Sequence, residues 1–109
     1  MRNPCRIRVS ERRFLNLPGH HGGAYVLAYV ESTADRADTA ACAAPRIDFE
    51  IGDGAGHVTL RFAIDTAGER LNTFHKVDTL LETLRRFRDG LAAEAQLHAE
   101  RRARLDGRA

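Results

Sequence analysis

The fold of this chain is decided by residues 72–105, which read NTFHKVDTLLETLRRFRDGLAAEAQLHAERRARL. Apolar side chains recur there at steps of three and four, the spacing that places them on one face of an α-helix. The residues of this face are Val77, Leu80, Leu81, Leu84, Phe87, Leu91 and Ala95. No proline interrupts the stretch, and Gly90 is its one weak helix former. The sequence therefore predicts one long helix from Asn72 to about Leu105, with Asn72 or Thr73 as its cap.

Four strands are predicted ahead of this helix, because apolar and polar residues alternate there or form short apolar runs between turn signals. Their ranges are 6–10, 24–30, 46–51 and 57–65. A second apolar segment at residues 14–17 follows the first strand, which is expected to be bent or to consist of two short pieces. The strand over 24–30 is apolar on both sides and reads as a central strand.

The last two strands flank a glycine-rich segment, Gly52–Gly56, and are predicted to form a β-hairpin. With residues 53–56 as the turn, Phe49 should face Leu60 on the apolar side. Asp48 should then face Arg61 on the opposite, solvated side. This register is favoured because a slip by one residue would move every large apolar side chain of a strand to the wrong face.

The β-β-β-β-α order predicts an α+β fold, a four-stranded antiparallel sheet with one long C-terminal helix packed across one face. The helix stripe is expected to pack on Leu27, Phe49, Leu60 and Phe62. A sheet that closes partway into a barrel is the alternative. The length fits a single domain over 1–109, with a flexible loop over 32–44 and a projecting helix end and basic tail over 92–109.

The net charge of +2 conceals a segregation in which both ends are basic and the middle is acidic. No apolar run approaches transmembrane length and the first residues lack the apolar core of a secretory signal, so a cytoplasmic protein without a membrane partner is expected. The two cysteines, Cys5 and Cys42, lack metal-ligand spacing and are expected to be free thiols.

Catalytic and cofactor-binding motifs are not found, so no cofactor is expected. His20 and His21 lie in a loop that reads PGHHGG, where glycine allows close backbone approach and histidine can bind a partner or a metal. A small enzyme or metal-binding protein that uses this loop is one alternative function. Nucleic-acid binding through the arginine-rich ends is another, although acidic residues interrupt the basic C-terminal segment.

The function that the sequence favours is that of a small interaction module, an adaptor, inhibitor or accessory protein of bacterial or phage type. It would bind another protein or itself, most simply as a two-fold homodimer. The helix is predicted to outrun the sheet, and its apolar stripe continues as a seam of small side chains. The residues proposed to contact a partner are His20, His21, Ala92, Ala95, Ala99, Arg101, Arg102 and Ala103.

Overall fold

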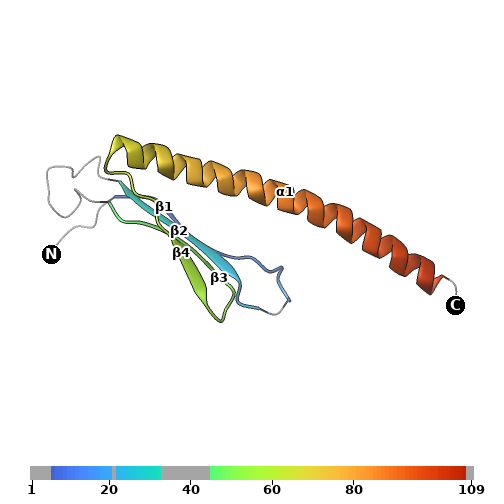
Figure 1. Cartoon of the computed structure of the whole chain (residues 1–109). Coiled ribbons are helices and arrows are strands. Elements are labelled where there is room, and N and C mark those ends of the chain that lie inside the picture. The colour runs from blue at the N-terminus through green and yellow to red at the C-terminus, as the bar shows by residue number, and fades with distance from the viewer. Residues whose placement is uncertain (1–5, 21, 33–44, 108–109) are drawn as a thin grey trace. The chain divides into compact units, whose positions relative to one another are not determined.

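In a computed structural model of the 109-residue chain, residues 6–20, 22–32 and 45–107 are described. The chain divides into two compact units, Met1–Thr66 and Ala67–Ala109, and each is described by itself. The first is an antiparallel sheet and the second a single helix, in the order β1-β2-β3-β4-α1 (Figure 1). The predicted α+β class is confirmed. The packing of the helix across the sheet and the single-domain organisation stay predictions.

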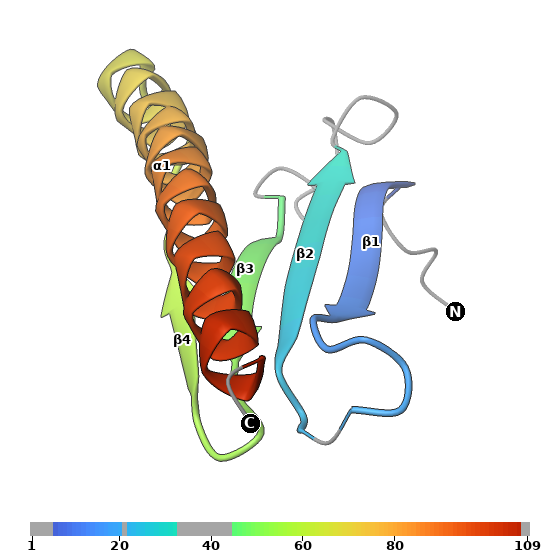
Figure 2. The ribbon, with the colours of Figure 1, turned by 90° about the vertical axis from the view of Figure 1, so that its right-hand side faces the viewer.

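The sheet contains β1 (Arg6–Phe14), β2 (Tyr25–Ser32), β3 (Ile47–Gly52) and β4 (His57–Leu60). Strands that follow one another along the chain are neighbours in the sheet, and each pair is antiparallel (Figure 2). Among the described strands β1 and β4 are the two edges and do not pair with each other. The result is an open meander and not the partly closed barrel.

The boundaries of β1 and β2 differ from those predicted. β1 continues through the charged residues after Ser10 as far as Phe14, which pairs with Tyr25. The break expected after Ser10 is not found, because residues 10–14 pair with β2 without interruption; a register shift lies earlier, between Ile7 and Val9, where an extra residue is accommodated in the ladder. β2 runs on to Ser32, so the predicted loop over 32–44 lies, apart from that residue, outside the described part of the chain, as do both cysteines.

The hairpin of β3 and β4 has the predicted register, with Phe49 opposite Leu60. Its turn is closed by the amide of Asp53, which donates to the carbonyl of Gly56 at 3.1 Å. The Asp53 carboxylate accepts bonds from the amides of Ala55 and Gly56, each at 2.9 Å. These two bonds, that from Gly56 first, hold the pKa of Asp53 below its usual value. A carboxylate thus supplies the turn chemistry that the glycine pattern predicted.

β4 ends at Leu60, well short of Asp65, where the fourth predicted strand ended. The expected opposition of Asp48 and Arg61 therefore lies beyond the last paired residues of the ladder. The Asp48 carboxylate instead accepts a bond from Nε of Arg46 at 2.6 Å.

The pairing assigns each strand residue to one of two sheet faces, because paired residues project to the same side. One face is mainly apolar and carries Val9, Val26, Ala28, Val30, Ile47, Phe49, Ile51, Val58 and Leu60, with Glu11 and Arg13 of β1 on the same side. The ring of Phe49 meets that of Phe62 edge to face, with centroids 5.9 Å apart. Leu27 pairs with Glu50 and thus lies on the opposite face. The predicted core set that joined Leu27 to Phe49 was wrong in this residue, since neighbours along a strand point to opposite sides.

The helix α1 (Ala67–Asp106) has 40 residues and begins five residues before the predicted start. Thr66 precedes it and Glu69 lies three positions later, the spacing of a capping box, which is a stronger start signal than Asn72 or Thr73. Two side-chain bonds along its surface are local. Arg86 donates to Glu82 at 2.7 Å, and Gln96 donates to Glu100 at 3.0 Å.

Candidate interaction surfaces

The apolar stripe of α1 is exposed along most of its length. Leu84 is 59% exposed, Phe87 62% and Leu91 53%, values typical of surface residues and not of a core. Single exposed leucines are ordinary, but a continuous row of large apolar side chains marks a surface that another element covers. The stripe is therefore a candidate interaction surface of the helix unit.

The stripe follows a seven-residue repeat more closely than its general helical spacing suggests. Alternating steps of three and four connect Phe74, Val77, Leu81, Leu84, Arg88 and Leu91. These are the a and d positions of a heptad, the pattern by which two helices pack side chains into each other. Leu80 and Phe87 lie beside the row and widen it. The sequence alone contains this repeat, but the predicted helix face left out Phe74, the residue that begins it.

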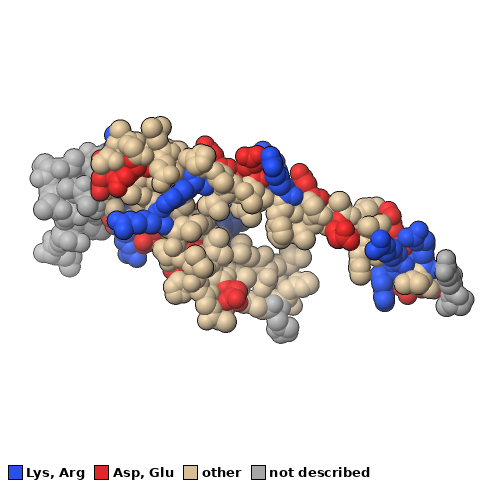
Figure 3. All heavy atoms as spheres, in the orientation of Figure 1, with Lys and Arg blue, Asp and Glu red and all other residues tan. Residues whose placement is uncertain are grey.

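The distal part of α1 holds six of the residues predicted to contact a partner. Ala92, Ala95, Ala99 and Ala103 follow at steps of three and four and share a face, and all four are exposed. Arg102 lies near this face, whereas Arg101, two residues from both Ala99 and Ala103, projects from nearly the opposite side of the helix. Lysine and arginine side chains gather near the C-terminal end of α1 (Figure 3).

The loop that contains His20 is held by backbone contacts. The amide of Leu15 donates to the carbonyl of Ala24 at 2.8 Å, and the amide of His20 donates to that of Leu17 at 3.0 Å. A side chain on Gly54 would lie 3.2 Å from Cα of Gly23, so the loop approaches the β3–β4 turn backbone to backbone. The His20 residue is exposed, and His21 lies outside the described residues.

Metal binding finds no support in the arrangement of the described side chains. Within residues 6–20, 22–32 and 45–107, no three histidine, cysteine, aspartate or glutamate residues come together in a way that could hold an ion. The structure brings neither His57 nor a carboxylate into a described contact with His20.

The polar face of the sheet carries a cross-strand arrangement that sequence reasoning missed. The Tyr25 hydroxyl donates to Glu50, and the guanidinium carbon of Arg12 lies 4.9 Å from the centre of the Tyr25 ring. The ring also covers Gly52, where an added β-carbon would overlap it. The bond to Glu50 is the main reason why the pKa of Tyr25 lies above its usual value.

Tyr29, four residues along β2, makes a related set of contacts, but its acidic partner lies on the same strand. The Tyr29 hydroxyl donates to Glu31 at 2.9 Å, and the guanidinium carbon of Arg46 lies 5.1 Å from the centre of the Tyr29 ring. The hydrogen bond to Glu31 is the largest of the causes that raise the pKa of Tyr29. Each tyrosine is thus engaged at its hydroxyl and on its ring, and the contacts of Tyr25 with both neighbouring strands suit a structural role in aligning β1, β2 and β3.

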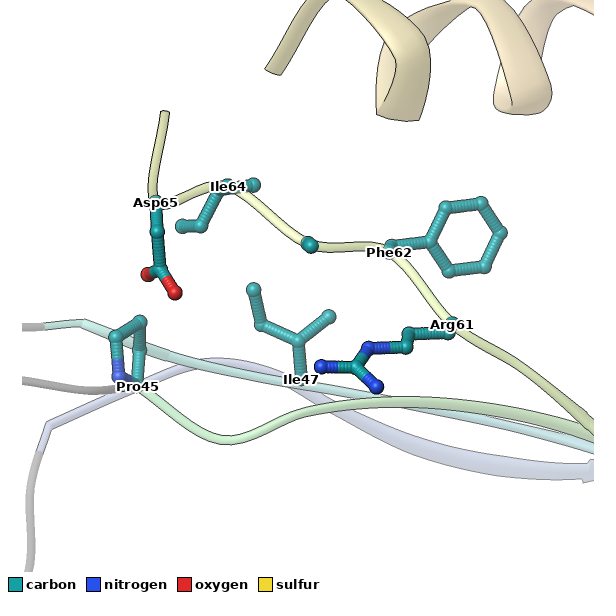
Figure 4. A pocket seen from close by; sticks show the side chains of 7 residues that line it. Pro45, Ile47, Arg61, Phe62, Ile64 and Asp65 are labelled. Atoms are coloured by element: carbon teal, nitrogen blue, oxygen red, sulfur yellow. The ribbon is translucent and has the colours of Figure 1, made fainter. Parts of the chain in front are cut away.

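A shallow hollow of about 190 Å³ lies at the end of the hairpin. It is lined by Pro45, Ile47, Arg61, Phe62, Ala63, Ile64 and Asp65. In Figure 4 the Arg61 guanidinium extends toward Ile47, while the Phe62 ring points away from the centre of the hollow. The lining has one acid, one base and no nucleophile, and it forms no catalytic constellation.

Within the described residues no helix combines the length and the apolar character that crossing a bilayer requires. Comparisons with protein-family models, with curated proteins and with solved structures found no match to this chain.

Proposed function

We propose that this protein is a small interaction module, an adaptor, inhibitor or accessory protein that acts by binding another protein or a second copy of itself through α1. The observation that carries the proposal is the exposed row of large apolar side chains on that helix. Such a row is unfavourable in water and becomes favourable when a partner covers it.

The lengths of the two units support this reading. At about 1.5 Å per residue, the 40 residues of α1 extend over about 60 Å. β1, the longest strand, has nine residues and spans at most about 30 Å. A sheet of that size can cover only about half of the helix, whichever way the two are arranged. The remaining half needs another partner, because most helical stability in proteins comes from packing of an amphipathic face.

The charge distribution favours nucleic-acid binding less than it favours binding to a protein. Glu94, Glu100 and Asp106 are interspersed among the arginines of the distal helix, so the basic side chains do not form a continuous track for phosphates. On the sheet, the ring-stacked Arg46 also bonds to the carboxylate of Asp48. In neither of these two places are basic side chains separate from acidic ones.

The test introduces a charge into the stripe and a matched charge on the far side of the helix. Leu84→Arg should remove association of the full chain in sedimentation velocity, because the guanidinium would have to be buried at the contact. Thr79→Arg, on the opposite side, should leave association unchanged. Both variants place arginine, a good helix former, at the altered position.

A photoreactive phenylalanine analogue at position 87 identifies what covers the stripe. We expect cross-linked products that contain a second polypeptide. Cross-links confined to residues 6–65 of the same chain would assign the stripe to an internal core and would exclude the proposed function, as would a Leu84→Arg chain that keeps its normal association and stability.

A further inference from the structure

We infer that α1 binds α1 of a second copy in an antiparallel coiled coil, in the register that places Leu81 opposite Leu84 of the other chain. The inference rests on the proposed function and specifies its partner. It uses the segment from Phe74 to Leu91, where the heptad positions are filled by large apolar residues except at Arg88.

The direction of pairing follows from Arg88. In a parallel pair each a position meets the same residue of the other chain, and Arg88 would face Arg88 at the centre of the contact. In an antiparallel pair an a position faces a d position. Arg88 then faces Val77, where its apolar stem can cover the valine while the charged end reaches water. The parallel arrangement is disfavoured by a like-charge contact that the antiparallel one avoids.

The register follows from two charged residues on one edge of the stripe. Asp78 and Arg85 are seven positions apart, about 10.5 Å along the helix, so they lie on the same edge but too far apart to bond to each other. Within the described residues, the ion pair on this part of α1 joins Arg86 to Glu82. Asp78 and Arg85 make no such pair, and both are exposed.

In the inferred register Asp78 of each chain lies beside Arg85 of the other, so the contact contains two such pairs. On the other edge Leu80 of each chain lies beside Phe87 of the other. A shift by one heptad in one direction would place Arg85 against Arg85, and a shift in the other direction would place Asp78 against Asp78. Opposite charges thus favour one register, and like charges oppose its two neighbours.

Charge exchange in the full chain tests this arrangement. Asp78→Arg leaves two arginines on the edge of each chain, and Arg85→Asp leaves two aspartates. Each variant alone should associate roughly tenfold more weakly than the unaltered chain, because two attractive contacts become repulsive. An equimolar mixture should regain the original affinity as a heterodimer, and so should the variant that carries both changes. Sedimentation equilibrium and native mass spectrometry give the two readouts.

Asp89→Arg supplies the matched control, since it makes the same change of charge on the outer side of the helix and should leave the affinity unchanged. A monomeric unaltered chain, or single variants that bind as well as it does, or a mixture that forms no heterodimer, would overturn the inferred dimer. A chain that associates through Leu84 but ignores both charge changes would overturn the register and still support the proposed function.

Discussion

The sheet contains side-chain bonds between residues far apart in the sequence, whereas the side-chain bonds described on α1 join residues four apart. Tyr25 bonds to Glu50, 25 residues away. On α1 the corresponding side-chain bonds, such as that from Arg86 to Glu82, join residues four apart. The local bonds of the helix do nothing to cover its apolar stripe. The difference implies that perturbing the sheet should act within one chain and perturbing the stripe should act between chains.

The largest expected effect comes from Leu84→Ala on the stripe. Where the chain is associated, the loss of unfolding free energy should be about 2–5 kcal/mol, the usual range for emptying a packed leucine site. In dilute samples, where the stripe is uncovered, it should be within about 0.5 kcal/mol. Urea unfolding at a series of protein concentrations measures both. A loss of about 2–5 kcal/mol at every protein concentration would instead mean that Leu84 packs against the sheet of its own chain, as the sequence predicted.

Phe49→Ala gives the contrasting result for the sheet. Removing a ring that packs edge to face on Phe62 should lower the unfolding free energy by about 2–4 kcal/mol, slightly less than for a fully buried ring because Phe49 is half-buried. The effect should be the same at every protein concentration. Val58→Ala, on the same face but 62% exposed, is the control and should have a small effect.

Gly52→Ala should be the next in size and tests the polar face of the sheet. The new methyl group would overlap the Tyr25 ring, and moving the ring would weaken its bond to Glu50. A loss of about 1–3 kcal/mol is typical of such overpacking. Gly56→Ala, where a side chain would meet open space, is a matched control in the same hairpin. Equal stability of the two variants would show that the ring does not rest on Gly52.

The smallest effect is a change in tyrosine titration. The chain has two tyrosines and no tryptophan, so the ultraviolet absorbance of phenolate reports both directly. Tyr25 and Tyr29 should both titrate above 10.0, and Glu31→Ala should return the pKa of Tyr29 toward that value. The hydrogen bond to Glu31 raises the pKa of Tyr29 in the folded state. Its contribution to stability is therefore complete below pH 10.0 and is lost as the pH rises through the folded-state pKa of Tyr29. A Tyr29 titration that is insensitive to Glu31 would exclude the bond.

Local patterns in the sequence determined the elements of this fold and one pairing between them. Strand alternation around Gly52–Gly56 predicted the hairpin and the opposition of Phe49 and Leu60, because strand period and turn chemistry act over a few residues. The spacing of its apolar residues predicted the long helix. Thr66 and Glu69 form the capping-box pattern at its observed start, which the predicted start at Asn72 did not take into account.

Only the tertiary structure decided which face each strand of the sheet presents to its neighbours. Nothing near Leu27 indicates that Ala28, and not Leu27, shares a face with Phe49, because that relation is set by pairing across about twenty residues of intervening chain. Pairing between distant strands also sets the contacts of Tyr25 with Glu50 and Arg12. It likewise brings Gly23 close to Gly54. Periodicity specifies which side chains lie together within an element, whereas contacts between elements depend on a register that several long-range interactions set jointly.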